Sequence, residues 1–214
     1  MKIVSIIPIK LNNERLPGKN TKLLNGIPLI HYVQNNLLSE ERIDERYIFC
    51  SSEEIKDYIL PGVTYLKRPQ YLDEPTSNFT QIFEEFMRLV PADIYVYSHA
   101  TAPFIENSTT RDCLSQVLSR KFDSAFCAVK IQDFLWQHGM PLNFDVENLP
   151  RSQELEPIYR ETSGVYVFRK EVFQHLRRRV GSNPFIKEVT FREAIDINTA
   201  EDFSLAEIMA KHVL

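Results

Sequence analysis

The clearest signal for the fold lies at the start of the chain, where residues 2–30 read KIVSIIPIKLNNERLPGKNTKLLNGIPLI. Residues 2–9 are rich in β-branched side chains and apolar on both faces, which is typical of a buried parallel strand. A polar loop follows over residues 10–25, and apolar residues then recur at helical spacing from Ile27 to Leu37. A strand, a long polar loop and a helix in this order predict the front of a βαβ unit.

The same alternation continues along the chain. Apolar runs predict further strands over residues 46–50, 63–66, 94–97, 124–130, 164–168 and 188–197. Helical spacing predicts helices over residues 51–60, 79–90, around 114–118 and after 199, with capping signals at Ser51–Glu54 and Thr199–Asp202. Strands that alternate with helices predict an α/β fold, a three-layer α/β/α sandwich around a mostly parallel, Rossmann-like sheet.

Residues 132–160 interrupt this rhythm with several prolines and asparagines and no clear period. Because no repeat or linker is visible, we interpret residues 1–214 as a single domain with an inserted excursion at 132–160. Long irregular segments are usually functional or form interfaces. An apolar cluster within it suits a subunit interface, although its Trp could instead pack under the loop of one subunit; the cluster comprises Phe134, Leu135, Trp136 and Met140.

Composition excludes several classes of protein. The 214 residues include 25 Lys and Arg and 29 Asp and Glu, a net charge of −4, which argues against a nucleic-acid binder. No apolar run reaches the roughly 18 residues of a membrane span, and no cleavage site follows the first run, so we expect a cytoplasmic protein. Cys50, Cys113 and Cys127 are widely spaced and are interpreted as reduced core thiols, with a catalytic or metal role as the alternative.

The loop after the first strand is the first place to look for a ligand, because ligands bind at the carboxyl ends of parallel strands. Lys10, Arg15 and Lys19 lie within ten residues, and Gly18 allows close backbone approach. This combination predicts either a phosphate site or a basic surface loop. The P-loop and dinucleotide-binding glycine patterns are both absent.

This loop, together with Leu24-Asn25-Gly26 and Pro28-Leu29-Ile30, resembles the signature of the acylneuraminate cytidylyltransferases, the CMP-sialic acid synthetases. The Kdo cytidylyltransferases have a similar opening. The likeness continues through Lys67-Arg68-Pro69, Thr76-Ser77-Asn78, His99-Ala100-Thr101-Ala102-Pro103-Phe104, Arg151-Ser152-Gln153, Ser163-Gly164-Val165-Tyr166 and residues 194–203. His99 stands where the family usually has Gln, and Asn198 where it has a second carboxylate.

The resemblance implies transfer of CMP from CTP to the anomeric hydroxyl of a 2-keto-3-deoxy sugar acid, such as a sialic or other nonulosonic acid, with release of pyrophosphate, for the biosynthesis of surface polysaccharide. It also implies a homodimer in which the 132–160 excursion reaches the partner's site. Two alternatives stay open: a Kdo or other sugar nucleotidylyltransferase, and a catalytically weakened nucleotide-binding module, which Asn198 would suit.

The resemblance also implies roles for individual residues. Lys10 and Lys19 would be catalytic cations of the phosphate-transfer step. Arg15 is a further catalytic candidate, although the family pattern does not fix its role. The nucleotide would lie near Pro8, Asn12, Asn20, Arg68, Thr76 and Ser77, although Arg68 could be a surface residue and Ser77 an N-cap.

For the metal, Mg²⁺ would be held by Asp196 and Asn198. We expect Asp196 to end a buried strand just before a capped helix, although it could instead be a turn residue that caps the last helix. The sugar acid would contact residues from several segments, and His99 could instead be a packed strand-end histidine. These sugar-binding candidates are His99, Thr101, Arg151, Gln153, Ser163 and Tyr166. Arg177–Arg179 is interpreted as a solvent-facing helix end.

Overall fold

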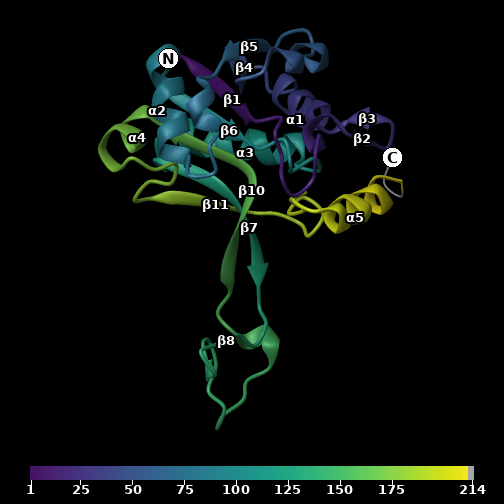
Figure 1. Ribbon diagram of the computed structural model, residues 1–214. Helices are drawn as coiled ribbons and strands as arrows, with labels where there is room; N and C mark the ends of the chain where they lie inside the picture. The colour runs from purple at the N-terminus through teal and green to yellow at the C-terminus, as the bar shows by residue number, and fades with distance from the viewer. Residues whose placement is uncertain (212–214) are drawn as a thin grey trace.

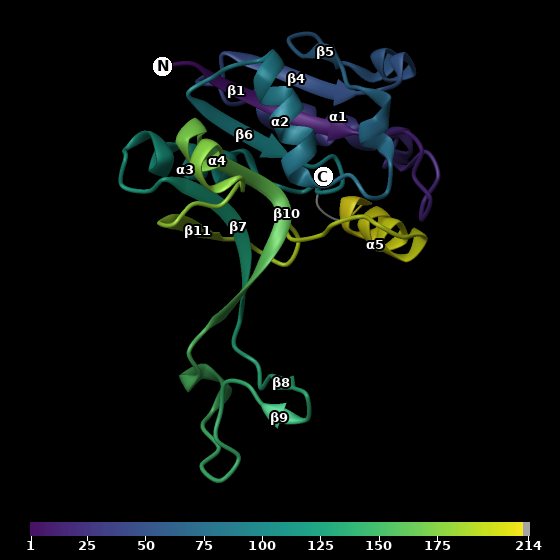
Figure 2. The ribbon, with the colours of Figure 1, turned by 60° about the vertical axis from the view of Figure 1, so that its left-hand side comes forward.

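The computed structural model describes residues 1–211, which build a seven-stranded sheet with helices on both faces (Figures 1 and 2). β10 runs antiparallel to its neighbours β6 and β7, and the other strand pairs of the sheet are parallel. The mostly parallel α/β fold predicted from the sequence is confirmed. In sheet order the strands are β11 (Pro184–Glu188), β7 (Ser124–Ile131), β10 (Ile158–Arg169), β6 (Ile94–Ser98), β1 (Ile3–Ile9), β4 (Glu45–Cys50) and β5 (Thr64–Lys67).

Two apolar clusters on opposite faces of the sheet make the three layers. The first packs α1 (Leu29–Leu38) and α3 (Asn107–Leu118) against one face, and the second packs α2 (Phe79–Leu89) and α4 (Lys170–Leu176) against the other. β1 contributes Ile7 to the first cluster and Ile6 to the second, so the strand is buried on both sides. α5 (Ala200–Lys211) closes a smaller third cluster through Phe203.

Short elements complete the chain. The 3₁₀ helices are η1 (Lys19–Thr21), η2 (Glu53–Tyr58), η3 (Gln70–Asp73) and η4 (Ser152–Glu154). Two small hairpins pair β2 (Leu23–Leu24) with β3 (Ile27–Pro28) and β8 (Trp136–Gln137) with β9 (Met140–Pro141). All three cysteines are buried and free, as expected of core thiols. No helix in residues 1–211 is long and apolar enough to cross a membrane.

The strand predicted over residues 188–197 is wrong. β11 occupies residues 184–188 instead, and the chain then turns, with Ala194 N–H donating to Thr190 O at 3.0 Å. The buried side chains Val189, Ala194 and Ile197 produced an apolar pattern that resembled a strand. The predicted cap of the last helix is confirmed, because Thr199 Oγ1 accepts from Asp202 N–H at 3.2 Å.

Two other capping expectations need correction. The segment after β4 is the 3₁₀ helix η2, and its N-cap is Ser52, which accepts from Glu54 N–H, rather than Ser51. α2 begins after Asn78, whose side chain forms a reciprocal capping box with Gln81. Ser77 is therefore not an N-cap, and its hydroxyl donates to Tyr71 O at 3.3 Å.

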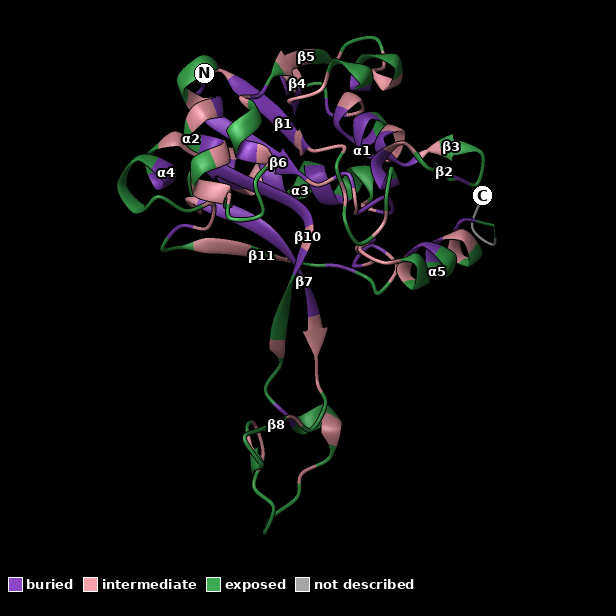
Figure 3. Cartoon of the chain, viewed as in Figure 1, coloured by how far each residue is buried: buried purple, intermediate pink, exposed green. Residues whose placement is uncertain are grey.

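Residues 132–157 form an arm that projects from the ends of β7 and β10, well away from the sheet (Figures 1 and 2). Most of the arm is exposed (Figure 3). Trp136 remains 58% exposed although its ring packs edge-on against Phe144, at 5.4 Å between centroids. The expectation that Trp136 might be covered within one subunit is therefore not met.

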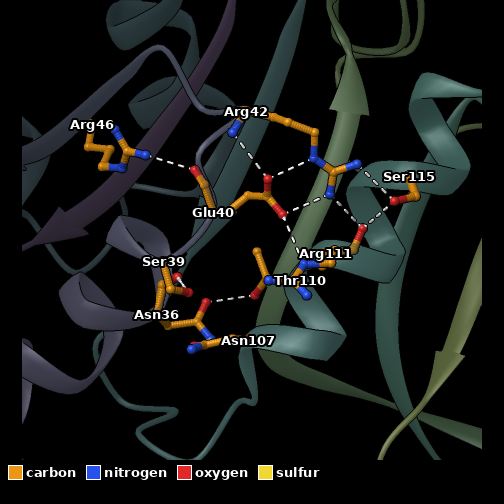
Figure 4. A network of polar contacts seen from close by, with 9 residues as sticks. All are labelled: Asn36, Ser39, Glu40, Arg42, Arg46, Asn107, Thr110, Arg111 and Ser115. Carbon is orange, nitrogen blue, oxygen red and sulfur yellow. Dashed lines mark hydrogen bonds and ion pairs between the residues drawn. The ribbon is translucent and has the colours of Figure 1, made fainter.

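A polar network ties α1 to α3 at the end of the sheet where β1 begins (Figure 4). The buried Glu40 carboxylate accepts from Arg42 at 2.7 Å, and Arg42 also donates to Ser115 of α3 at 2.9 Å. Because the cationic loop follows the other end of β1, this network lies opposite the candidate site and stabilises the scaffold.

Candidate active site

The loop after β1 is anchored so that its cations point to one place. Asn20 is buried and its amide donates to Lys10 O at 3.0 Å, while Gly18 has a left-handed backbone with φ of 66°. That conformation favours glycine, since a side chain would be strained there. The loop and the closing segment line a cavity of about 240 Å³, the loop cavity, which includes Lys10, Asn13, Arg15, Lys19 and Asn198.

Lys19 joins the loop to the closing segment. Its Nζ donates to Ile197 O at 2.8 Å and to Asn198 Oδ1 at 3.3 Å, and the residue is only 8% exposed. Arg15 Nη2 donates to the same Asn198 oxygen at 3.1 Å. Burial lowers the pKa of Lys19 and the Asp196 carboxylate partly restores it. Two cations therefore converge on one amide oxygen, a position that an anionic ligand can also reach.

Asp196 lies beside this pair of cations. Its Oδ2 accepts from Ser163 at 3.1 Å and from Asn198 Nδ2 at 2.8 Å, whereas Oδ1 is buried without a partner. The expectation that Asp196 ends a strand is wrong. Its neighbour Ile197 nevertheless holds this segment at the same sheet edge, because Ile197 N–H donates to Thr101 O at 2.8 Å. No cluster of three His, Cys, Asp or Glu side chains suited to a metal occurs within residues 1–211.

One free carboxylate oxygen nevertheless fits Mg²⁺, which is often held by one or two carboxylates together with substrate phosphates. Asn198 turns its oxygen toward the cations and its NH₂ toward Asp196. The carboxylate accounts for this orientation, because it needs a donor while the cations need an acceptor.

A second cavity of about 240 Å³, the sheet-edge cavity, adjoins the first through Lys10. Its lining includes Pro8, Lys10, Arg68, Ser77, Tyr97 and His99. Arg68 is 3% exposed, pairs with Asp73 and keeps its Nε without a partner. Arg68 is therefore not a surface residue.

His99 presents a buried Nε2 with no hydrogen-bond partner. Burial lowers its pKa to about 4, helped by the positive charge of Arg179. The imidazole is neutral at pH 7, so it can donate a hydrogen bond to a ligand or accept one from it. Tyr97 and Tyr166 flank the ring at 5.2 and 6.3 Å between centroids.

The structure brings most predicted site residues to this edge of the sheet, but not all. Asn12 and Thr76 are exposed, and Asn12 lines a separate hollow beside Ser51 and Asp73. Arg151 and Gln153 are exposed on the arm, where Arg151 Nε donates to Glu154 at 2.8 Å. A further cavity of about 580 Å³ beside Tyr32, Phe104 and Arg192 contains none of the predicted residues.

Two residues of the site were missed by sequence reasoning. Asp73 pairs with buried Arg68 and accepts from Ser51, and nothing in the motif indicated this acid. Arg179 was expected to face solvent, but its guanidinium lies 3.8 Å from the centre of the Tyr166 ring. α4 ends at Leu176 and Arg177 turns left-handed, which directs the following residues back over the sheet.

The fold and the site together define a nucleotidyltransferase-like protein. The chain matches the family described as Cytidylyltransferase over residues 4–211, and it belongs to that family. This finding confirms the resemblance inferred from the motifs.

Three similar curated proteins are 22–24% identical to the chain over the aligned residues. N-acylneuraminate cytidylyltransferase of Oncorhynchus mykiss is 24% identical over 96% of this chain and 49% of its own length. CMP-N,N'-diacetyllegionaminic acid synthase of Legionella pneumophila is 23% identical over 97% of this chain and 95% of its own length. Pseudaminic acid cytidylyltransferase of Campylobacter jejuni is 22% identical, covering 99% and 97%. The chain spans about half the length of the first curated relatives it matches.

Solved structures share the fold. A CMP:2-keto-3-deoxy-manno-octonic acid synthetase complexed with CTP superposes with a TM-score of 0.74 at 19% identity, covering 100% of both chains. A 4-diphosphocytidyl-2C-methyl-D-erythritol synthase from Anaerococcus prevotii gives a TM-score of 0.68 at 13% identity, covering 99% and 97%. At these identities the likeness concerns the fold alone.

Proposed function

We propose that this protein is a Mg²⁺-dependent cytidylyltransferase that transfers CMP from CTP to the anomeric hydroxyl of a 2-keto-3-deoxy sugar acid and releases pyrophosphate. One observation carries the proposal: Lys19 and Arg15 converge on Asn198 beside the unpartnered Asp196 oxygen. A triphosphate needs cations and a metal-binding carboxylate at one place, and these residues supply both.

In this proposal the phosphates of CTP lie in the loop cavity, next to Lys10, Arg15 and Lys19. The positive charge of these three side chains neutralises the phosphate oxygens as the acceptor hydroxyl attacks and pyrophosphate leaves. Asp196 would hold Mg²⁺ together with those oxygens, and the ion would add charge neutralisation there. Asn198 would bind the same ion through its neutral amide oxygen.

The sheet-edge cavity would hold the rest of the reactants. Arg68 and Ser77 would contact the nucleotide on one wall, while neutral His99 would meet the acceptor on another. Positioning the hydroxyl against the α-phosphate is the main requirement of this chemistry. The names of the relatives point to sialic, legionaminic or pseudaminic acid as the class of acceptor.

The arm would build a homodimer. It exposes a run of large apolar side chains that a second arm or subunit could cover: Trp136 at 58%, Met140 at 67%, Leu142 at 52%, Val146 at 57% and Leu149 at 62%. In the dimer Arg151 would reach the sugar carboxylate in the partner's site. The free buried cysteines suit a reducing cytoplasm, where CTP is made.

Pyrophosphate release with Mg²⁺ tests the proposal across four ribonucleoside triphosphates and a panel of N-acetylneuraminate, other nonulosonic acids, Kdo and sugar phosphates. Turnover with CTP and one sugar acid, absent without metal or acceptor, would support it. Turnover with a sugar phosphate would indicate another nucleotidyltransferase. CTP binding without turnover would support a nucleotide-binding module, which the neutral Asn198 favours.

A further inference from the structure

Arg179 occupies an unexpected position close to His99, the residue of the sheet-edge cavity that is proposed to meet the acceptor. Its guanidinium lies 3.8 Å from the centre of the Tyr166 ring, 5.4 Å from Phe79 and 5.9 Å from Tyr97. Tyr97 lines that cavity together with His99, and His99 also packs near Tyr166. Arg179 and His99 thus share the same two tyrosine rings.

The guanidinium is held in place by one nitrogen, and its other donors have no partner among the described residues. Nη2 donates to the Tyr166 hydroxyl at 2.9 Å and to Glu161 Oε1 at 3.1 Å. Within residues 1–211, no hydrogen bond joins Nε or Nη1 to the protein, and a quarter of the side chain is exposed. A stacked, planar guanidinium with free donors loses little entropy when it binds a carboxylate.

The proposed reaction favours a positive charge at this place. An acidic acceptor must approach CTP, whose phosphates repel it, and the cations of the first loop are occupied by those phosphates. A cation outside that set would favour binding of the acid. Among the described residues that stack on Tyr97 and Tyr166, Arg179 is the one with a permanent positive charge.

We infer that Arg179 binds the carboxylate of the acceptor within its own subunit and determines the preference of the enzyme for acidic acceptors. This inference rests on the proposed function and adds a residue to it. Arg151 of a partner's arm can bind the same group, since a carboxylate accepts from two arginines.

A structural role for Arg179 predicts something different. If the arginine only stabilised this cluster, Arg179→Gln and Glu161→Gln would both act by removing the ion pair. Glu161→Gln would then impair acceptor binding at least as much, because the Tyr166 hydroxyl also donates directly to Glu161 Oε1 at 2.6 Å. If Arg179 binds the substrate, only its own loss removes a ligand. Removing Glu161 frees the guanidinium and leaves acceptor binding intact or tighter.

The test compares Arg179→Gln, Arg179→Lys and Glu161→Gln, with exposed Arg178→Gln as the matched control. The KM of the acceptor is measured at saturating CTP, the KM of CTP at saturating acceptor, and the melting temperature for each variant. We expect Arg179→Gln to raise the acceptor KM about 10- to 100-fold, as loss of a charged hydrogen bond does. The KM of CTP should change less than about twofold, and Arg179→Lys should recover part of the loss.

The acceptor's methyl ester provides the second measurement. Wild type should prefer the acid, and Arg179→Gln should lose most of that preference. An acceptor KM within about twofold of wild type, or equal effects of Arg179→Gln and Glu161→Gln, would overturn the inference.

If wild type releases no pyrophosphate with any acid, the proposed function fails separately. Arg179 is then judged by calorimetric binding of N-acetylneuraminate and Kdo with CTP present. Binding to wild type that Arg179→Gln abolishes supports the inference; absent or unchanged binding overturns it.

Discussion

The ion pair between Arg68 and Asp73 allows a quantitative test of the site. Arg68 is 3% exposed and Asp73 25%, so the buried charge of the arginine depends on this acid for compensation. Removing one partner of a buried pair costs about 3–5 kcal/mol, and the partial exposure of Asp73 reduces this to about 2–3. We expect Asp73→Ala to lower the free energy of unfolding by about that amount.

A double-mutant cycle isolates the interaction. Arg68→Met removes the buried charge and leaves Asp73 partly in water, so it should cost about 1 kcal/mol. The double variant should then cost about as much as Arg68→Met alone, which gives a coupling energy of about 2–3 kcal/mol.

Urea unfolding monitored by circular dichroism measures all three variants. Glu53→Ala is the matched control, since it removes an acid paired with Lys56 on an exposed surface and should leave the midpoint unchanged. Coupling below about 0.5 kcal/mol would refute the reasoning, because the two residues would then act independently. CTP binding should weaken in Asp73→Ala, since Arg68 loses its anchor.

Four further outcomes are expected. Lys19→Met should lower kcat about 100-fold or more, because a buried cation next to the phosphates is lost; unchanged turnover would exclude the loop cavity as the phosphate site. Arg151→Ala should raise the acceptor KM and leave CTP binding intact, and equal loss of both would contradict its role in the partner's site. Asn198→Asp should tighten Mg²⁺ binding by calorimetry while lowering the melting temperature without metal, since two carboxylates then adjoin. Arg42 holds the pKa of Glu40 below its ordinary 4.5. The pair of Glu40 with Arg42 therefore stabilises the fold above that pH, and this contribution is lost as the pH falls through the lowered pKa. The stability gap between wild type and Glu40→Gln should therefore shrink between about pH 6 and pH 3, and a constant gap would argue against this linkage.

The order of strands and helices was predictable because it depends on local patterns. Residues 2–9 are apolar on both faces, and only a strand at the centre of a layered fold can bury them. Helical spacing from Phe79 to Val90 likewise predicted α2 within one residue of its end. The pattern failed at 188–197, where the fold buries side chains from a turn rather than a strand.

The residues themselves indicated the loop after β1, which carries Lys10 and Lys19, because ligands bind where parallel strands end. The resemblance to a known family added Arg68 and Asp196 to the site. Neither the residues nor the resemblance could show what each side chain meets there. Asp73 beside Arg68, the convergence of Arg15 and Lys19 on Asn198, and Arg179 over Tyr166 all join residues distant along the chain or in different elements. Local sequence sets the periodicity of an element and where it ends, whereas contacts between elements depend on how the layers pack, and that is decided only in the tertiary structure.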